Sequence, residues 1–258
     1  MLNKKKYKIL ITNDDGLFSD GLFPLIKEMK KIADVCAIVP EKEMSAVSHS
    51  LTLCSPVRIK EVKINGQKIK LVTGTPADCV RLGIIELQKF KTDIVVSGIN
   101  QGPNLGQDVN YSGTVAAARE AIFLNTSGIA VSTLGSNYSS VAKFTRQIVE
   151  HILRYKTKEK NFFLNINFPK NIPKDVRITS LGERKYEDIV FKKKDPIGIP
   201  YYWLKSKLIK NLPQRSFSSD ISSVENGYIS ITPLTFDITD YNQLETLKEF
   251  FKNFKIKK

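Results

Sequence analysis

Short apolar runs alternate with amphipathic stretches over the first two thirds of this chain, and no other feature constrains its fold as strongly. The runs that read as strands are residues 8–12, 35–39, 94–97, 128–132 and 162–167. The stretches with a helical period are residues 21–31, 76–89, 114–124 and 139–155. Strands that alternate with helices form βαβ units, in which helices cover both faces of a parallel sheet. We therefore predict a Rossmann-like three-layer α/β sandwich with a mostly parallel sheet.

Two further patterns lie outside this alternation. Residues 57–62 and 68–72 alternate in polarity and are joined around Asn65-Gly66, a dipeptide that favours the type I′ turn of a β-hairpin. After residue 180 the sequence becomes aromatic, lysine-rich and punctuated by proline. We predict a catalytic core over residues 1–180 and, over 181–258, an arm with closing elements rather than a second domain. The closing elements are a strand at 227–231 and a helix at 239–254.

The arm, residues 186–213, contains the aromatic run Tyr201-Tyr202-Trp203. Such a cluster is too large an apolar surface to leave in water on a monomer. We expect the arm to pack on a partner subunit, giving a homodimer or homotetramer, or to border the site.

The charge of the chain is strongly basic, with 40 lysines and arginines against 26 aspartates and glutamates, a net +14. The lysine runs lie at the termini or beside proline and glycine, and arginine is not interleaved with aromatic residues. This favours a solvated surface that attracts small anionic substrates over a surface for nucleic-acid polymer. A nucleic-acid-binding module remains an alternative that the net charge alone supports.

The location of the protein is inferred from what the sequence lacks. Its first apolar stretch ends at Asn13-Asp14-Asp15, too early for a secretory leader, and no run approaches the ~18 apolar residues of a membrane span. Its three cysteines form no CxxC pair, which favours a reducing compartment. We expect a cytoplasmic protein without a membrane partner.

Polar side chains follow three of the predicted strands. Asp14 and Asp15 end the first, Ser45 lies in the loop after the second, and Asn100 follows the third. The carboxyl ends of parallel strands meet at a crevice that binds ligands, and a bound cation would relieve the repulsion between the two aspartates. Because all four side chains offer oxygen, the pattern predicts a site for Mg²⁺, Mn²⁺ or Ca²⁺ rather than zinc.

A long polar loop, SGINQGPNLGQDVNYSGT over residues 97–114, opens an alanine-rich helix at Ser112-Gly113-Thr114. Long loops inside compact domains are usually functional. The free amides and positive dipole end of a helix start bind phosphate. The alternative is that Ser112 or Thr114 is only an N-cap.

The sequence leaves the roles of the two histidines undecided, and it offers one competing function. His49 either assists a leaving group or hydrogen-bonds within its own loop, and His151, far from every motif, is surface or core filler. A histidine-based zinc site is not supported. A dinucleotide-binding oxidoreductase would need a glycine-rich turn directly after the first strand, where this chain has Asp14 and Asp15.

Several stretches, in this order along the chain, resemble the SurE (survival protein E) family of nucleotidases. They are ITNDDG (11–16), VPEKEMSAVSHSLTL (39–53), GTPADCV (74–80), DIVVSGINQGPNLGQDVNYSGTVAAAREA (93–121) and LNINFP (164–169). Two positions depart from the family's common residues: Ala46, where glycine is frequent, and His49, where asparagine is.

The resemblance implies a metal-dependent phosphomonoesterase that acts on nucleoside 5′- and 3′-monophosphates and, in some members, on short polyphosphate. It implies one divalent ion per subunit, Mg²⁺ or Mn²⁺, held by Asp14, Asp15, Ser45 and Asn100. Its phosphate contacts fall on Asn104, Ser112, Gly113 and Thr114. We assign Asp14 as principal ligand and Asp15 to the attacking water, with an aspartyl-phosphate intermediate as the alternative.

Overall fold

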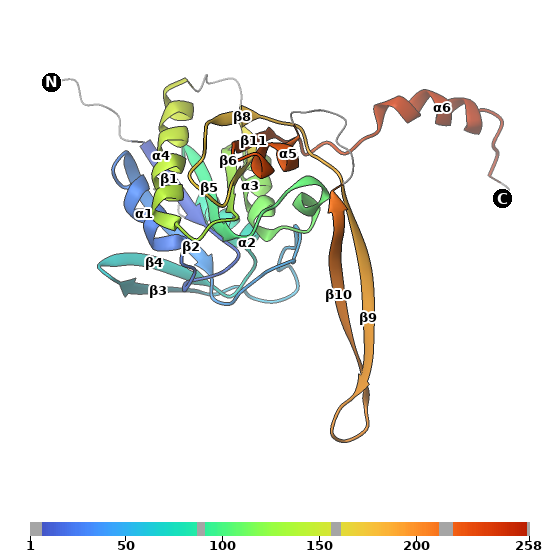
Figure 1. Ribbon diagram of the computed structural model, residues 1–258, viewed down its shortest axis with the longest axis horizontal. Coiled ribbons are helices and arrows are strands. Elements are labelled where there is room, and N and C mark those ends of the chain that lie inside the picture. Colours follow the sequence, from blue (N-terminus) through green and yellow to red (C-terminus); the bar gives the residue numbers. More distant parts are fainter. Residues whose placement is uncertain (1–6, 87–90, 156–160, 212–218, 257–258) are drawn as a thin grey trace.

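A computed structural model describes residues 7–86, 91–155, 161–211 and 219–256 of the chain. Within them, nine strands form one sheet in the order β3-β4-β2-β1-β5-β6-β7-β11-β8. Figure 1 shows how this sheet lies among the helices. The strands are β1 (Tyr7–Thr12), β2 (Ala33–Pro40), β3 (Ile59–Ile64), β4 (Gln67–Val72), β5 (Ile94–Gln101), β6 (Ser127–Thr133), β7 (Phe163–Phe168), β8 (Val176–Ile178) and β11 (Ile229–Pro233).

The central strands run parallel, as predicted. β2 pairs with β4 and β1, β1 pairs with β5, and β6 pairs with β5 and β7, all in parallel register. The predicted hairpin is also confirmed, because β3 and β4 pair antiparallel through Asn65 and Gly66. Both turn residues have positive φ, 49° and 73°, the backbone of a type I′ turn.

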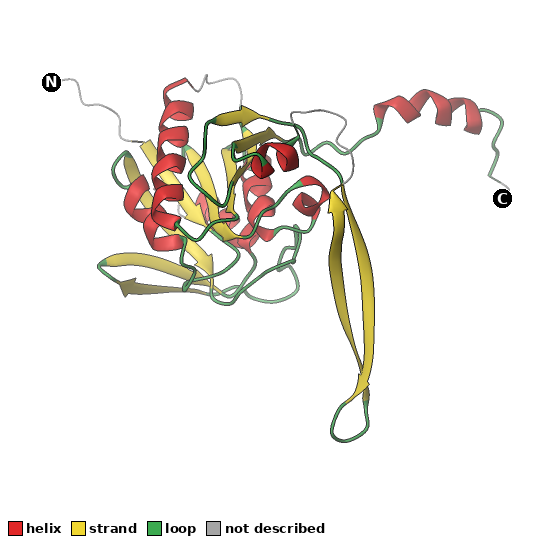
Figure 2. Ribbon diagram, viewed as in Figure 1, coloured by secondary structure: helices red, strands yellow, loops and turns green. Residues whose placement is uncertain are grey.

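Helices cover both faces of the sheet and complete the three layers (Figure 2). α1 (Leu22–Met29) and α4 (Tyr138–Tyr155) pack together on one face, and α2 (Pro76–Arg81) and α3 (Gly113–Phe123) pack on the other. The apolar stripe of α1 is buried, as its spacing predicts. The predicted helix at 76–89 is shorter, because α2 ends at Arg81 and continues as the π-helical segment η1 (Leu82–Glu86).

Residues beyond 180 take part in the main sheet. The short helix α5 (Asp220–Glu225) leads into β11, which lies between β7 and β8. β11 pairs antiparallel with β7 over four residues. The main sheet therefore contains residues from both sides of position 180, the boundary that we predicted between the core and the arm.

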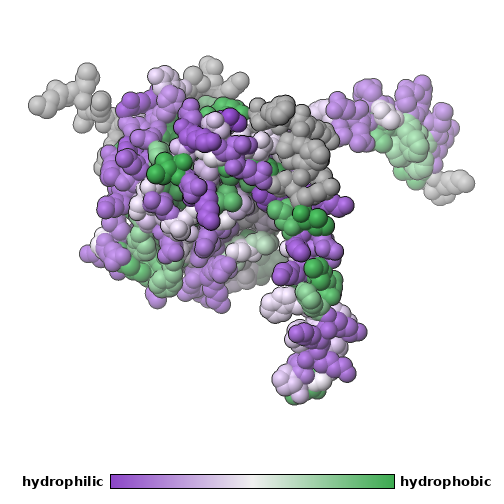
Figure 3. Space-filling model, viewed as in Figure 1, coloured by the Kyte–Doolittle hydropathy of each residue, from purple (hydrophilic) through white to green (hydrophobic). Residues whose placement is uncertain are grey.

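The arm is a two-stranded hairpin that projects from the body of the protein (Figure 1). It consists of β9 (Arg184–Lys194) and β10 (Pro200–Asn211), paired antiparallel. Apolar and charged side chains alternate along its surface in Figure 3, and Trp203 is 67% exposed.

The last helix, α6 (Tyr241–Phe251), forms where the sequence predicts a closing helix but does not close the core. It extends away from the sheet in Figure 1 and none of its residues is buried. Apolar side chains gather on one side of this helix in Figure 3. Phe250, one of its residues, is 78% exposed. The helical period identified the element correctly, but it could not identify the surface that the apolar stripe covers. No helix in the described ranges is both long and apolar enough to span a membrane.

Candidate active site

The turn after β1 fixes the two adjacent aspartates at the carboxyl end of the sheet. Asn13 closes this turn twice, since its Nδ2 donates to the Gly16 carbonyl (2.8 Å) and its Oδ1 accepts from the Gly16 amide (3.0 Å). Gly16 has φ +79°, a left-handed conformation that glycine adopts without strain. The side chains of Asp14 and Asp15 are thus presented on a rigid turn.

Asp14 is held by the first turn of α3. The Thr114 hydroxyl donates to Asp14 Oδ1, and the Thr114 amide lies 3.3 Å from Oδ2. Gly113 allows this approach, because a Cβ there would lie 3.0 Å from the Asp14 Cβ and 3.1 Å from the Met44 carbonyl. Asp14 is buried, so its carboxylate depends on these donors and on whatever occupies the adjoining space.

The ends of β1, β2 and β5 and the loop before α3 surround one pocket of about 600 Å³. Its lining includes five of the residues singled out from the sequence: Asp14, Ser45, Asn100, Asn104 and Ser112. Asp15 lines a smaller pocket of about 260 Å³, together with Glu43 and Gln101. Gln101 also lines the larger pocket.

A shift in strand register brings Asn100 to the pocket. β5 and β6 pair regularly up to Ser97 and resume, out of step, at Asn100, a local irregularity of the kind that redirects side chains near active sites. The Asn100 amide group donates to the Gly102 carbonyl (2.9 Å), which leaves its side-chain oxygen available.

A network of asparagines fixes Asn104. Its Nδ2 donates to the Ser132 hydroxyl (2.8 Å), and its backbone amide donates to Asn167 Oδ1 (2.8 Å). Its carbonyl accepts from the side chains of Asn165 and Asn167. Sequence reasoning did not identify Asn165 and Asn167 as supports, although both lie in the LNINFP stretch.

The start of α3 has two separate functions in the structure. Ser112 is the N-cap, and its hydroxyl accepts from the Val115 amide (3.1 Å). Thr114 is fully buried against Asp14 and does not line the pocket. The amide and hydroxyl of Thr114 therefore serve to orient a carboxylate.

The base of the hairpin forms one wall of the larger pocket, through Tyr186, Asp188 and Ser206. Asp108 anchors this wall, since it accepts from Arg184 (2.7 Å) and from the Tyr186 hydroxyl (2.9 Å). The arm therefore borders the pocket, which is one of the two alternatives that the sequence predicts for it. The individual residues could not be identified from sequence, because their partners lie 76 to 78 positions away.

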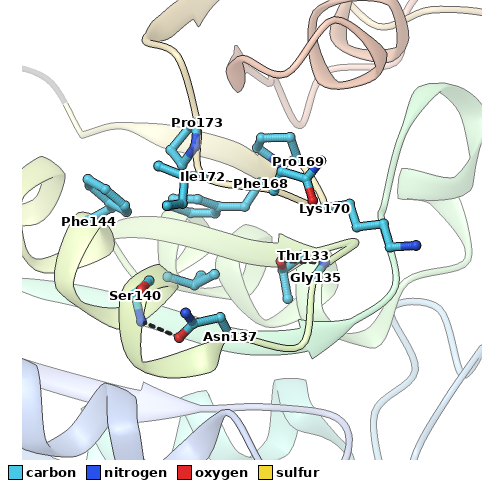
Figure 4. A pocket seen from close by; sticks show the side chains of 12 residues that line it. Thr133, Gly135, Asn137, Ser140, Phe144, Phe168, Pro169, Lys170, Ile172 and Pro173 are labelled. Carbon is cyan, nitrogen blue, oxygen red and sulfur yellow. Dashed lines mark hydrogen bonds between the residues drawn. The ribbon is translucent and has the colours of Figure 1, made fainter.

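A different cavity, of about 430 Å³, lies between the start of α4 and the loop after β7 (Figure 4). Phe144, Phe168 and Ile172 form much of its wall, and no carboxylate lines it. This cavity therefore lacks the carboxylate ligands that a metal site needs, which the pocket lined by Asp14 has.

Of the two histidines, His49 contacts Glu120 of α3 across 2.7 Å rather than a group of its own loop. His151 is exposed on α4 and packs against Tyr155, with ring centroids 4.6 Å apart.

Comparison with known proteins identifies the family. The model of the family described as "Survival protein SurE" matches residues 9–188. The chain belongs to the SurE family. It is 41% identical to the 5′-nucleotidase SurE of Syntrophomonas wolfei, over 96% of both chains, and 44% identical to that of Geotalea uraniireducens, over 94% of this chain and 98% of the relative. The crystal structure of the SurE protein from Aquifex aeolicus superposes with a TM-score of 0.79 at 37% identity, covering 94% and 98% of the two chains.

Keeping both aspartates of this SurE family member ionised costs free energy, because they are adjacent and partly or fully buried. Burial, and next the charge of Asp14, raise the pKa of Asp15 to about 6. Burial also raises the pKa of Asp14, although the Thr114 hydroxyl opposes this. A divalent cation beside the pair would offset that cost, and Ser45 and Asn100 add neutral oxygens at the same pocket. This donor set fits a hard cation such as Mg²⁺ or Mn²⁺.

The Asp15 pKa predicts how a substitution changes stability without metal. The folded-state pKa of about 6 lies above the ordinary 3.8, so the wild type gains stability as pH falls through 6 toward 4. Asp15→Asn removes the charge, and we expect its unfolding free energy in EDTA at pH 7.5 to exceed that of the wild type by about 1 kcal/mol, after discounting for solvent screening. Denaturation at pH 7.5 and pH 5 checks this. The difference should shrink at pH 5, and a variant less stable than wild type at pH 7.5 would contradict it.

Proposed function

We propose that this chain is a divalent-metal-dependent 5′-nucleotidase that hydrolyses nucleoside monophosphates to nucleoside and phosphate. The observation that carries the proposal is the pair Asp14-Asp15 at the end of β1 and beside the start of α3, with Ser45 and Asn100 lining the same pocket as Asp14. The relatives named 5′-nucleotidase SurE support the reaction type.

Asp14, Asp15, Ser45 and Asn100 would hold one Mg²⁺ or Mn²⁺ per subunit. When bound, the ion neutralises charge on the phosphoryl oxygens and lowers the pKa of water. Thr114 keeps Asp14 in a fixed orientation through its hydroxyl and amide. A ligand held in this way loses little conformational freedom on binding.

We assign to Asp15 the role of accepting the proton of the attacking water. Asp14 is buried and accepts from both the hydroxyl and the amide of Thr114, whereas Asp15 is less buried and accepts a long bond, 3.4 Å, from the Ser19 hydroxyl and one from the Gln101 backbone. Asn104, Ser112 and the Gly113 backbone would contact the phosphoryl group, and Thr114 would act on it through Asp14.

The substrate range follows from where the polar groups lie. The polar groups at the strand ends would surround the phosphate, and Tyr186, Asp188 and Ser206 of the hairpin wall would face the nucleoside, since all of them line the same pocket. We propose that 5′- and 3′-monophosphates of several bases are hydrolysed, with base discrimination within ~3 kcal/mol. Short polyphosphate, which also ends in a terminal phosphoryl group, belongs to the same proposal. With Cys36, Cys54 and Cys79 unpaired, we place the protein in the cytoplasm.

Phosphate release from a panel of nucleoside 5′- and 3′-monophosphates tests the function. Hydrolysis should be abolished by EDTA and restored by Mg²⁺ or Mn²⁺. Equal rates with and without EDTA would contradict the metal proposal. A salt-sensitive gel shift with no phosphatase activity would favour the nucleic-acid-binding alternative.

Assembly is proposed to use the hairpin, whose exposed aromatic side chains need a partner surface. Replacing residues 190–204 by Asn-Gly keeps the pairs Asp188–Ser206 and Ile189–Lys205 and removes Trp203. We expect light scattering to show a smaller assembly than that of the full chain. A variant with Lys192, Lys193 and Lys194 changed to glutamine is the control for lost charge and should assemble normally. An unchanged mass for the shortened chain would refute the proposal.

A further inference from the structure

A nearly buried glutamate connects three elements around the site. Glu120 of α3 is 1% exposed, and each of its carboxylate oxygens has a different partner. Its Oε2 accepts from His49 Nε2 (2.7 Å), and its Oε1 accepts from Arg81 Nε of α2 (2.6 Å). The His49 ring also stacks on Phe123, with centroids 5.6 Å apart and planes 15° apart.

His49 belongs to the loop that carries Ser45, residues 41–52. At one end of this loop the Met44 amide donates to the Asp14 carbonyl (2.7 Å). Further along, the Ser48 amide and hydroxyl donate to the carbonyls of Tyr111 (3.0 Å) and Asn110 (2.6 Å). Ser45 itself is exposed, and its hydroxyl contacts only Glu43 of the same loop among the described residues.

The backbone of this loop is strained on both sides of Val47. Ala46 has φ +56° and Ser48 has φ +53°, left-handed conformations that residues with a side chain seldom adopt. Such conformations persist only where surrounding contacts impose them. His49 directly follows the strained residue Ser48. Its side chain hydrogen-bonds to the buried carboxylate of Glu120 and so connects the loop to helix α3.

We propose that His49 is a positioning residue which, through Glu120, holds the loop so that Ser45 faces Asp14 and Asn100. The inference rests on the proposed function, because it assigns Ser45 to a divalent cation. Without the imidazole, Glu120 keeps Arg81, a partner that is 43% exposed and lies on a different element. The strained loop then loses its bond to α3, and the remaining bonds of Met44 and Ser48 hold Ser45 at the pocket less firmly.

Manganese binding to the full-length protein, measured by isothermal titration calorimetry, tests this without relying on turnover. We expect His49→Ala to weaken Mn²⁺ binding roughly 10-fold, the lower range found when groups supporting metal ligands are removed. His49→Gln, whose amide can still donate to Glu120, should stay within about threefold of wild type. Under saturating Mn²⁺, His49→Ala should have the same KM for a nucleoside monophosphate as the wild type, because the proposed phosphate contacts on α3 are unchanged.

His151→Ala is the matched control, since it removes the other histidine of the chain from the exposed face of α4. It should bind Mn²⁺ like wild type. Should His49→Ala fold poorly by circular dichroism, His49→Leu keeps an apolar group against Phe123 while removing the bond to Glu120, and the same 10-fold loss is expected.

Three results would overturn the inference, and they are distinguishable. Wild-type Mn²⁺ affinity in folded His49→Ala or His49→Leu would refute the positioning role and leave the proposed function intact. Absence of Mn²⁺ binding by the wild type itself would overturn the proposed function and this inference with it. A loss in His49→Gln equal to that in His49→Ala would show that the bond to Glu120 is not what matters.

Discussion

Asp14→Asn is expected to lower phosphate release from nucleoside monophosphates by at least ~100-fold while leaving the protein folded. The carboxylate faces the pocket and contacts Thr114 rather than supporting the apolar core. Asparagine has nearly the same shape, but it presents one neutral oxygen where the proposed cation requires an anion, and its NH2 group cannot accept the second bond from Thr114. The loss should therefore appear both in Mn²⁺ affinity and in kcat.

Asp240→Asn is the matched control for this substitution. It makes the same chemical change at the N-cap of the exposed helix α6, a position where asparagine is equally suitable. Circular dichroism and kcat/KM should both match wild type. A folded Asp14→Asn variant with near-normal activity and metal affinity would refute the assignment of the site.

The sequence was sufficient for elements whose pattern is local. The apolar stripe of α1 is buried because its spacing puts four side chains on one face of a helix. Asn65-Gly66 predicts the edge hairpin because few other dipeptides adopt two successive positive φ angles. The grouping of Asp14, Ser45 and Asn100 followed from one topological rule, that parallel strands end at a common edge.

The supports of the site could not be predicted in the same way, because each joins residues distant in sequence. Thr114 contacts Asp14 across 100 positions, and His49 contacts Glu120 across 71. No periodicity records such pairs. Both Ser112 and Thr114 suit an N-cap, and only the coordinates show that Ser112 caps the helix while Thr114 turns toward the aspartate.

The position of α6 shows a different limit of sequence reasoning. A helical period predicts an apolar face, and burial of that face is the usual expectation. In this chain none of the residues of that helix is buried, and the aromatic residues Tyr201, Tyr202 and Trp203 of the hairpin are exposed too. A single sequence does not distinguish an apolar surface that meets its own core from one that meets another subunit.

A dinucleotide phosphodiester is expected to react at least ~100-fold more slowly, in kcat/KM, than a nucleoside monophosphate, a difference of about 2.7 kcal/mol. A diester has one negative charge fewer to interact with the cation and the start of α3. It also has a second nucleoside, for which we expect little room beside Gly113, where even an added Cβ would lie 3.0 Å from the Asp14 Cβ and 3.1 Å from the Met44 carbonyl.

The same dinucleotide with a terminal 5′-phosphate is the control, because it has the same size and bases but offers a monoester. Phosphate release from its end should approach the monophosphate rate while its internal bond stays intact, as chromatography of the products would show. Efficient cleavage of the internal bond would instead indicate a nuclease. The net charge of +14 would then serve to bind the polymer, since lysines that neutralise phosphates make binding steeply dependent on salt, and the rate should fall accordingly as salt is raised.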